Sequence, residues 1–255
     1  VWYLNYSKIR KLPTERDSMS GAYLGPNFSD AAIEEALITC GAKFHKFEEN
    51  LLIEKVAEAL AEEKAIGWMQ GRMEFGPRAL GARSIIADPR SPAMQKQLNL
   101  KVKYRESFRP FAPSILSEHV SDWFEHDGDS PYMLLVADIK KKRRRLMSKE
   151  EKALFGIAKL NIPRSSIPAI THVDYSARIQ TVHADTNPKY HALINKFFEK
   201  TGCPIVVNTS FNVRGEPIVC SPKDAFKCFM GSEIEVLAIG SYLLFKEEQS
   251  ESLKV

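Results

Sequence analysis

Several signatures that would classify the chain at once are missing from its 255 residues. The four cysteines, Cys40, Cys203, Cys220 and Cys228, form no CxxC pair and stand at no Cys/His metal spacing. Neither a zinc module nor a disulfide framework is therefore indicated, and free thiols are typical of a reducing cytoplasm. No apolar run approaches the length of a membrane span, and the N-terminus has no signal-peptide pattern. We therefore expect a cytoplasmic protein with no membrane partner and no metal site of its own.

A large net charge is missing as well. Lys and Arg number 36 against 32 Asp and Glu, and a formal charge of +4 is too mild to imply nucleic acid unless the basic residues are concentrated. The 44% hydrophobic content is ordinary for a globular protein, and the length suffices for one large or two modest domains. Because the chain begins with Val1 rather than Met, we expect a piece of a longer protein whose partner domain is missing.

The basic residues are concentrated in one region. Residues 72–109 hold nine Lys or Arg against three acids, and the stretch "GRMEFGPRALGARSIIADPR" at 71–90 holds four of the arginines. Arginine is a planar, permanently charged fork that matches phosphate and carboxylate oxygens two at a time, so this cluster suggests a bound anion. A solvated basic face explains the same residues, since most surface arginines bind nothing.

Hydrophobic periodicity predicts alternating helices and strands. Residues 1–28 are irregular and resemble a linker or arm. Helices are expected from Ser29, over 50–64, over 92–103, around Trp123, over 190–200 and from Ser221. Strands are expected over 65–71, 109–116, 132–139, 177–184, 203–212 and 236–245. This order predicts an α/β or α+β domain around one sheet, with the pattern failing between 140 and 166.

The strand "IVVNTSFN" turns abruptly polar at its end. Asn208, Thr209, Ser210 and Asn212 emerge there, and ligands of α/β sheets gather where strands end. Small hydroxyls and amides suit ribose, phosphate or urea-like groups. An ordinary Asx or Ser turn would use the same residues.

Basic residues accompany aromatic ones in "VKYRESFRPFAP". Lys103 and Arg109 lie beside Phe108, where they could line a phosphate pocket or simply remain in water around an aromatic anchor. Arg178 precedes an apolar strand, and nearby His172 and Asp174 favour a structural hydrogen bond over a metal pair.

Together these motifs predict a site of several cations and a few neutral donors, with no evident general base or thiol nucleophile. That composition suits phosphoryl or adenylyl transfer, in which positioning and charge neutralisation provide most of the catalysis. A Walker loop and a GxGxxG fingerprint are both absent, so a nucleotide would have to be bound in another way.

Four motifs in this order resemble a known family. "GRMEFGPRALGARSI", "VKYRESFRPFAPSI", "HVDYSARIQTV" and "NTSFNVRGEPIV" are similar to the C-terminal half of the O-carbamoyltransferases of the nodulation-protein and cephamycin or aminoglycoside antibiotic type, from about Tyr23 to Phe245. The resemblance implies a YrdC-like domain over 29–250, which is a twisted mixed sheet with flanking helices and a concave basic face. Residues 140–166 then form a charged insertion.

The resemblance also implies an activity. The family domain takes carbamoyl phosphate and ATP, with Mg²⁺ accompanying the nucleotide, forms a carbamoyl-adenylate and releases pyrophosphate and phosphate. An actin-like N-terminal domain, absent from this chain, transfers the carbamoyl group to a hydroxyl acceptor. A homodimer is also compatible with the resemblance.

The family's site residues correspond to positions in this chain. The resemblance implies catalytic roles for Arg78, Lys103 and Arg109, and nucleotide binding by these three with Arg178, Asn208, Ser210 and Asn212. Lys103 and Arg109 resemble a KxR-type phosphate clamp, although their spacing is longer, and Ser210 and Asn212 resemble an SxN element. We expect the four cations to converge on one cleft.

A second interpretation belongs to another class of protein. YrdC-like sheets are associated with RNA binding, and "KKKRRR" at 140–145 could contact a polyanion. We favour the enzyme, because a basic run of this kind is typical of a solvated loop. The sequence therefore predicts that the insertion is mobile and dispensable for nucleotide binding.

Overall fold

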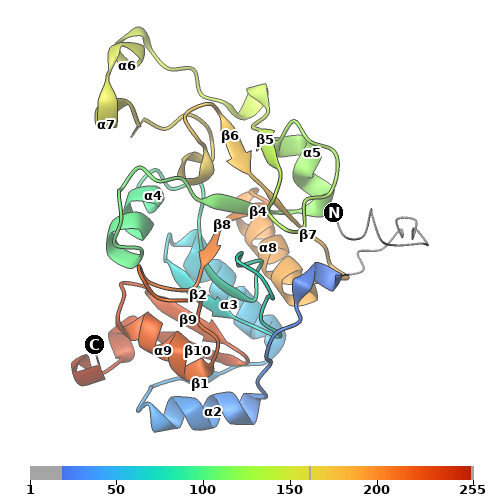
Figure 1. Ribbon diagram of the computed structural model, residues 1–255, viewed down its shortest axis with the longest axis vertical. Helices are drawn as coiled ribbons and strands as arrows, with labels where there is room; N and C mark the ends of the chain where they lie inside the picture. The colour runs from blue at the N-terminus through green and yellow to red at the C-terminus, as the bar shows by residue number, and fades with distance from the viewer. Residues whose placement is uncertain (1–18, 161, 254–255) are drawn as a thin grey trace, which may run out of the picture.

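The structure is a computed structural model that describes residues 19–160 and 162–253. The arm expected over 1–28 lies mostly outside the described residues, and its last part contains the short turn η1, Ser20–Ala22. From there the chain alternates between helices and strands (Figure 1). The α/β class predicted from the sequence is confirmed.

Eight strands form one mixed sheet in the order β1-β10-β9-β2-β3-β8-β4-β7. The pairs β2–β9 and β4–β7 are parallel, and the other neighbouring strands are antiparallel. The strands are β1 His45–Lys46, β2 Ile66–Met69, β3 Arg83–Ala87, β4 Ala112–Leu116, β7 Gln180–Val182, β8 Ile205–Ser210, β9 Val236–Ile239 and β10 Tyr242–Phe245.

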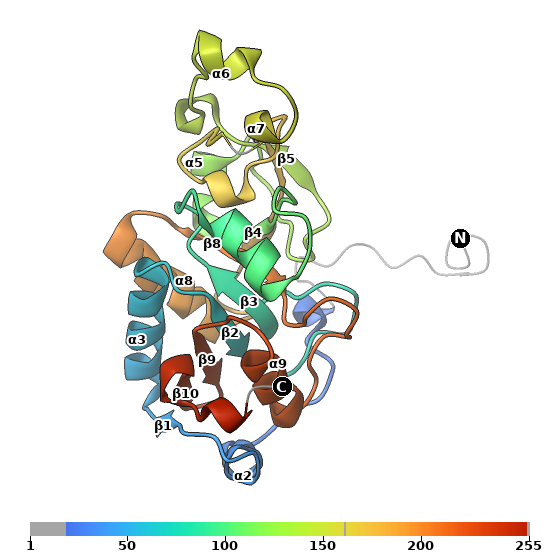
Figure 2. The same cartoon turned by 90° about the vertical axis from the view of Figure 1, so that its left-hand side faces the viewer.

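Helices cover both faces of this sheet, as Figure 2 shows. Helices α3, Glu49–Ala61, and α8, Pro188–Thr201, pack against each other on one face. Helix α9, Pro222–Met230, lies on the other face and contacts α2, Asp30–Thr39. The expected caps are present, since the Ser29 and Ser221 side chains accept hydrogen bonds from backbone N–H groups of the first turn.

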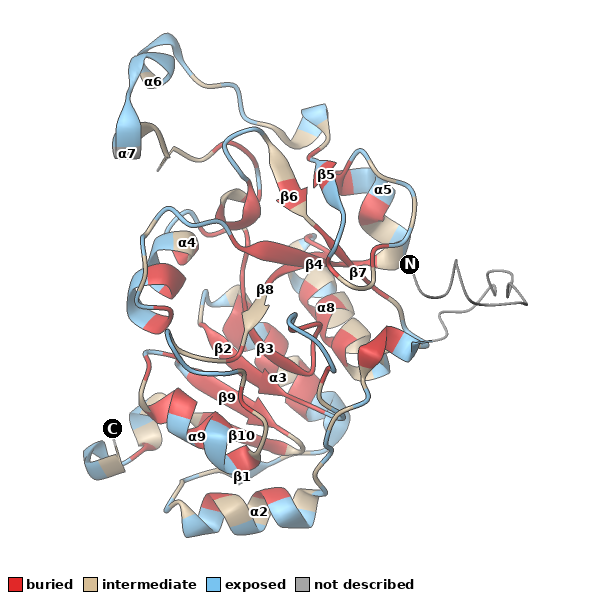
Figure 3. Cartoon of the chain, viewed as in Figure 1, coloured by how far each residue is buried: buried red, intermediate tan, exposed pale blue. Residues whose placement is uncertain are grey.

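The core lies between the sheet and these helices (Figure 3). The apolar stripe of α3 at Leu52, Val56 and Leu60 is fully buried, because its period of three to four residues turns one helix face toward the sheet. Strands β2, β3, β4 and β9 are buried along their whole length. This rigid centre fixes the loops that leave the strand ends.

A smaller lobe rises beyond β4 and β7. It contains the helix α5, Val120–Trp123, and a two-stranded sheet of β5, Val136–Asp138, and β6, Ser176–Arg178. The predicted insertion joins these strands and contains η4, α6 and α7; both views place α6 at the far end of the lobe (Figures 1 and 2). The bounds are η4 Lys141–Arg143, α6 Lys149–Ala153 and α7 Gly156–Leu160.

Contacts anchor the insertion at its base. The Arg143 guanidinium lies 3.7 Å from the centre of the Trp123 ring, and Arg144 Nε donates to the Ile139 carbonyl at 2.7 Å. Arg145 pairs with Glu151 at 2.7 Å. The expectation of a freely solvated basic run is therefore wrong for the three arginines, because their charges are used in intramolecular contacts.

The strands differ from the prediction in four places. The two-residue strand β1 was not predicted. Strand β3, in the middle of the sheet, was not predicted, because it begins at Arg83 and a charged residue normally indicates exposure. The strand expected over 177–184 is divided into β6 and β7, which belong to different sheets. The strand expected over 236–245 is the hairpin β9–β10, which turns at Gly240 with a φ of +55°.

The remaining helical segments are short. Helix α4, Met94–Gln97, continues into the π-helix η2, Leu98–Val102. The helix expected over 92–103 is therefore present as an α-helical turn followed by a π-helical turn. The turns η3 Ser117–His119, η5 Pro168–Ile170, η6 Lys246–Glu248 and η7 Glu251–Leu253 complete the described chain. Within the described residues, no helix combines the length and the apolar character needed to cross a bilayer.

Candidate anion-binding site

The carboxyl end of β8 turns directly into a polar loop. Ser210 Oγ donates to Asn212 Oδ1 at 2.7 Å, and Asn212 Nδ2 donates to the Glu216 carbonyl at 2.7 Å. These bonds close the SxN element into a defined turn. The structure thus places Ser210 and Asn212 in one turn, where their side chains are hydrogen-bonded to each other.

Lys103 reaches this turn from the end of η2. Its Nζ donates to the carbonyls of Ser210 and Asn212 at 2.5 and 2.9 Å, and to Asn212 Oδ1 at 2.8 Å. The residue is only 5% exposed, and burial lowers the pKa of its ammonium group to about 7. The nearby charge of Arg105 acts on the pKa in the same direction. Lys103 therefore both holds the turn and contributes a titratable charge beneath it.

An open cavity of about 220 Å³ lies over the turn, and we call it the anion cavity. Four of its lining side chains are basic and one is acidic, so the lining carries a net positive charge. Polar backbone and hydroxyl groups of the β8 turn form its floor. The lining residues are Lys103, Arg105, Glu106, Arg109, Thr209, Ser210, Asn212, Val213, Arg214 and Gly215.

One buried asparagine shapes the basic wall of the anion cavity. Asn99, which is 0% exposed, accepts a hydrogen bond from Arg105 Nε at 2.6 Å. Its Nδ2 donates to the carbonyls of Ser107 and Arg109 at 3.0 and 2.8 Å. A single side chain thereby fixes both the guanidinium of Arg105 and the backbone that carries Arg109.

Sequence reasoning missed Arg105 and Arg214. Arg105 stands two residues after Lys103, so "KYR" has the KxR spacing that the pair of Lys103 and Arg109 lacks. The signal for Arg105 was therefore present in the sequence. Arg214 follows the SxN element and donates to the Tyr104 carbonyl at 3.3 Å, and its position depends on how the turn folds.

Arg78 and Arg178 form a second pair of cations. Neither lines the anion cavity, whose basic residues are Lys103, Arg105, Arg109 and Arg214. Arg178 Nε is buried without a hydrogen-bond partner, and burial together with the charge of Arg78 lowers the pKa of Arg178. The described residues give neither guanidinium a carboxylate partner. Two like charges in this position would be stabilised by an anion between them.

Asn208 holds the Arg78 loop against the sheet. It is 1% exposed, and its Nδ2 donates to the carbonyl of Ala79, to Ser114 Oγ and to Gln180 Oε1. Ala79 directly follows Arg78, and Ser114 and Gln180 belong to β4 and β7. The structure therefore places Asn208 beneath the site, where it holds the Arg78 loop against the sheet.

The Arg78 loop is held from within by a buried carboxylate. Glu74 Oε1 accepts hydrogen bonds from the N–H groups of Leu80 and Ala82 at 2.7 Å. Gly81 adopts a φ of +105°, and a Cβ there would come within 2.2 Å of the Tyr190 ring. This close approach requires glycine. The loop consequently presents Arg78, which is exposed, at a fixed point.

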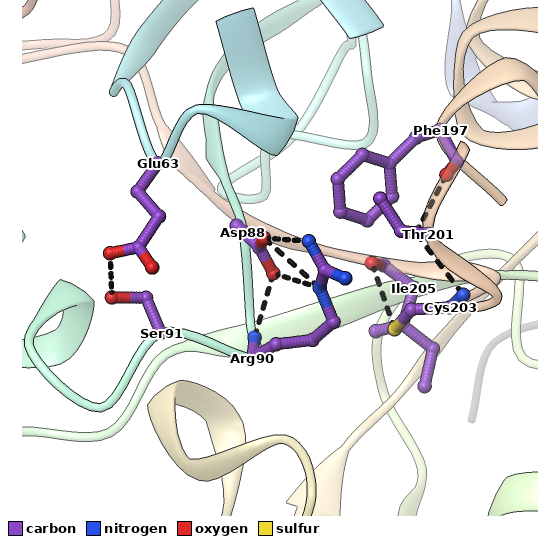
Figure 4. A network of polar contacts seen from close by, with 8 residues as sticks. All are labelled: Glu63, Asp88, Arg90, Ser91, Phe197, Thr201, Cys203 and Ile205. Carbon is purple, nitrogen blue, oxygen red and sulfur yellow. Dashed lines mark hydrogen bonds and ion pairs between the residues drawn. The ribbon is translucent and has the colours of Figure 1, made fainter. Parts of the chain in front are cut away.

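The other arginines of residues 71–90 are structural. Arg72 donates to the carbonyls of Leu24 and Gly25, and the fully buried Arg83 donates to carbonyls at both ends of its loop. Arg90 pairs with the buried Asp88 at 2.6 Å, beside the ring of Phe197 (Figure 4). Of the four arginines in this stretch, Arg78 alone is left for a ligand.

His172 and Asp174 behave as predicted from the sequence. His172 Nδ1 lies 3.2 Å from Asp174 Oδ1, which also accepts from the Ser176 hydroxyl and N–H. These bonds lower the pKa of Asp174 to about 2. Among the described residues no group of three or more His, Cys, Asp and Glu side chains could hold a metal ion.

Comparisons with known proteins match the chain to one family. A model of the family described as Carbamoyltransferase C-terminus matches residues 57–246. An uncharacterized protein of Synechocystis sp. is 54% identical over 98% of this chain and 41% of its own length. Nodulation protein NolNO of Sinorhizobium fredii is 39% identical over 92% of this chain and 32% of its own length. The 3'-hydroxymethylcephem-O-carbamoyltransferase of Streptomyces clavuligerus is 34% identical over 72% and 31%.

The chain spans 31% to 41% of the length of these three relatives. The region matched by the family model begins within α3 and ends just after β10. It includes every residue that lines the anion cavity, together with Arg78 and Arg178. The chain belongs to the carbamoyltransferase C-terminal family.

Proposed function

We propose that this chain is the carbamoyl-activating part of an O-carbamoyltransferase. It would form carbamoyl-adenylate from ATP and carbamoyl phosphate. Water first cleaves carbamoyl phosphate to carbamate and phosphate. A carbamate oxygen then forms a bond to the α-phosphorus of ATP, as the bond between that phosphorus and the oxygen of the leaving pyrophosphate breaks.

One observation carries the proposal, namely the anion cavity at the end of β8. Its basic side chains, Lys103, Arg105, Arg109 and Arg214, outnumber its single acid, Glu106. Such a lining suits a polyphosphate, since several fixed cations can neutralise charge on many oxygens. Ser210 and Asn212 add neutral groups that can orient a bound phosphate or carbamoyl group.

The Arg78 and Arg178 pair suits the second anion of the reaction. Carbamoyl phosphate and carbamate are both small anions, and the pair lacks a carboxylate partner among the described residues. We assign ATP phosphates to the anion cavity and the small anion to this pair. Mg²⁺ would enter with the nucleotide and be held chiefly by its phosphate oxygens.

Transfer to a hydroxyl acceptor is assigned to another part of a longer protein. The three relatives are more than twice as long as the part that this chain matches. We propose that an actin-like domain in that additional length binds the acceptor and receives the activated carbamoyl group.

RNA binding is the weaker alternative. It relied on residues 140–145, of which Arg143, Arg144 and Arg145 make intramolecular contacts. Of residues 140–145, Lys141, Lys142 and Arg145 are exposed. Such a short exposed stretch is a poor polyanion surface compared with the anion cavity.

Product analysis tests the proposal. The chain is incubated with ATP, carbamoyl phosphate and Mg²⁺, and carbamoyl-AMP and pyrophosphate are measured. We expect both products to require carbamoyl phosphate and to be lost in Arg109→Ala. Release of ADP and phosphate without carbamoyl-AMP would contradict the proposed chemistry.

A further inference from the structure

Residues 22–26 lie along the beginning of the Arg78 loop, and we call them the strap. Phe75 N–H donates to the Ala22 carbonyl at 2.7 Å, and Gly25 N–H donates to the Met73 carbonyl at 2.9 Å. A Cβ at Gly25 would lie 2.9 Å from that carbonyl oxygen, so the two backbones are in close contact. The strap and the first residues of the loop therefore form one hydrogen-bonded unit.

The strap also holds the far end of the Arg78 loop, through one side chain. The Tyr23 hydroxyl donates to the Leu80 carbonyl at 2.7 Å, and Leu80 is two residues beyond Arg78. Asn187 Nδ2 donates to the Tyr23 hydroxyl oxygen at 3.0 Å and so fixes its position. Burial raises the pKa of Tyr23, so the hydroxyl keeps its proton and remains a donor at neutral pH. Arg78 thus lies between two points that the strap holds.

The ring of Tyr23 connects the strap to Arg178 as well. It packs against a small apolar cluster that contains the buried side chains of Leu80 and Met133. Met133 Sδ lies 3.9 Å from Arg178 Nη2. One side chain of the strap therefore adjoins the supports of both guanidinium groups, although these come from distant segments of the chain.

The two arginines need this support, because they carry like charges at short range. Burial and the charge of Arg78 lower the pKa of Arg178, which shows that the guanidinium groups act on each other. Arg78 is exposed, so its place depends on the loop that carries it. Two arginines can bind the oxygens of one anion only at a suitable separation, since each guanidinium is a rigid fork. A structure that fixes their separation therefore fixes their affinity for an anion.

We propose that the strap positions the Arg78 and Arg178 pair for a small anion, with Tyr23 as the positioning residue. The identity of that anion as carbamoyl phosphate rests on the proposed function, whereas the positioning itself does not. Tyr23 does not line the anion cavity, so phosphates bound there should not depend on it. The last part of the segment that resembles an arm in the sequence thereby contributes to the site.

Tyr23→Phe tests the proposal, because it removes the hydroxyl and keeps the ring. Carbamoyl phosphate and inorganic phosphate are titrated by calorimetry into the chain after tripolyphosphate has saturated the anion cavity. We expect Tyr23→Phe to weaken both small anions by about two- to tenfold, as for one lost neutral hydrogen bond, and to leave tripolyphosphate affinity unchanged. Gly25→Ala, which displaces the strap from the Met73 carbonyl, should act in the same direction.

Tyr242→Phe is the matched control, because it removes a buried tyrosine hydroxyl from β10, toward the opposite edge of the sheet from β4 and β7. It should bind all three ligands as the unaltered chain does. Unchanged binding of the small anions in both strap variants, or an equal loss of tripolyphosphate, would overturn the inference. If the unaltered chain binds phosphate but not carbamoyl phosphate, and Tyr23→Phe weakens phosphate, the positioning holds and the proposed function fails. Binding of neither small anion would overturn both. Thermal unfolding verifies that each variant is folded.

Discussion

At the scale of single residues, Lys103 combines burial with positive charge. Four oxygen acceptors surround its ammonium group, but none is a carboxylate. Burial lowers the pKa from its ordinary value of 10.5 to about 7. Between pH 7 and pH 10.5, Lys103 is protonated in the unfolded chain and neutral in the folded one. The free energy of unfolding therefore rises as the pH rises through this range. Below pH 7 the cost of the buried charge is present in full.

Anion binding should respond to pH in the opposite sense. A polyphosphate favours the ammonium form, so binding above pH 7 requires proton uptake at Lys103. We expect tripolyphosphate affinity to fall by up to about tenfold for each pH unit above 7. Lys103→Arg keeps a permanent charge and should flatten this profile. If the tripolyphosphate affinity of the unaltered chain does not change between pH 7 and pH 9, Lys103 does not titrate at the site.

Ser210 and Arg109 separate neutral from charged contributions to binding. Ser210→Ala removes one neutral hydrogen-bonding group, worth about 0.5–1.5 kcal/mol, whereas a charge-assisted contact is worth about 1.5–3 kcal/mol. Arg109→Ala should therefore weaken ATP binding more than Ser210→Ala does. Its deficit should shrink at high salt, because screening removes part of the wild-type advantage. The site is misassigned if Ser210→Ala is the more damaging variant in titrations at low ionic strength.

Individual site residues were only partly predictable from the sequence. Motif resemblance led to Lys103, Ser210 and Asn212, which the structure brings together. Asn99 could not be found in this way, because one asparagine in an amphipathic helix has no distinguishing pattern. Its role appears only when the chain folds back and places the backbone of 107–109 against it.

At the scale of elements, the α4–η2 helix is a frame for the basic wall. It carries Lys103 at its end and Asn99 on its buried side. Asn99→Ala removes the acceptor for Arg105 and two donors to the following loop. We expect tripolyphosphate affinity to fall about tenfold or more, while Gln97→Ala on the exposed side leaves it unchanged.

A double-mutant cycle tests whether Asn99 acts through Arg105. If Asn99 orients that guanidinium, the losses in Asn99→Ala and Arg105→Ala should not add in the combined variant. Additive losses would show that Asn99 contributes only to general stability.

Arg143 is one of the three arginines of the basic run that anchor the insertion. Arg143 stacks on Trp123, and a cation-π contact of this kind is worth about 0.5–2 kcal/mol. Arg143→Ala should lower the free energy of unfolding by about 1 kcal/mol in urea titrations. Lys142→Ala, at the exposed neighbouring position, is the matched control and should have almost no effect. Equal effects of the two variants would contradict a specific anchoring role for Arg143.

The elements were predicted best where apolar periodicity is sustained over several turns. Helices α2, α3, α8 and α9 have apolar stripes, and all four are present. Strand β3 was missed because Arg83 is compensated by carbonyl groups from distant loops, a relation that no local pattern reveals. The division of β6 from β7 depends on the partner strands that each finds, which local sequence does not determine.

At the scale of the whole molecule, both proposed ligand positions lie around one end of the sheet. Asn208 joins the Arg78 loop to β4, β7 and β8, so the arginine pair and the anion cavity share one rigid support. An activated carbamoyl group formed there would have to pass to the additional length found in the relatives. We propose that the activating step itself requires only residues of this chain.

Pyrophosphate exchange tests that central claim most directly, since it reports adenylate formation without an acceptor. The chain is supplied with ATP, Mg²⁺, carbamoyl phosphate and labelled pyrophosphate, and label entering ATP is measured. We predict exchange that depends on carbamoyl phosphate, is lost in Arg109→Ala and is retained in Lys142→Ala. Exchange that persists unchanged in Arg109→Ala and Arg105→Ala, or its absence from the unaltered chain when that chain binds ATP, would contradict activation at the anion cavity.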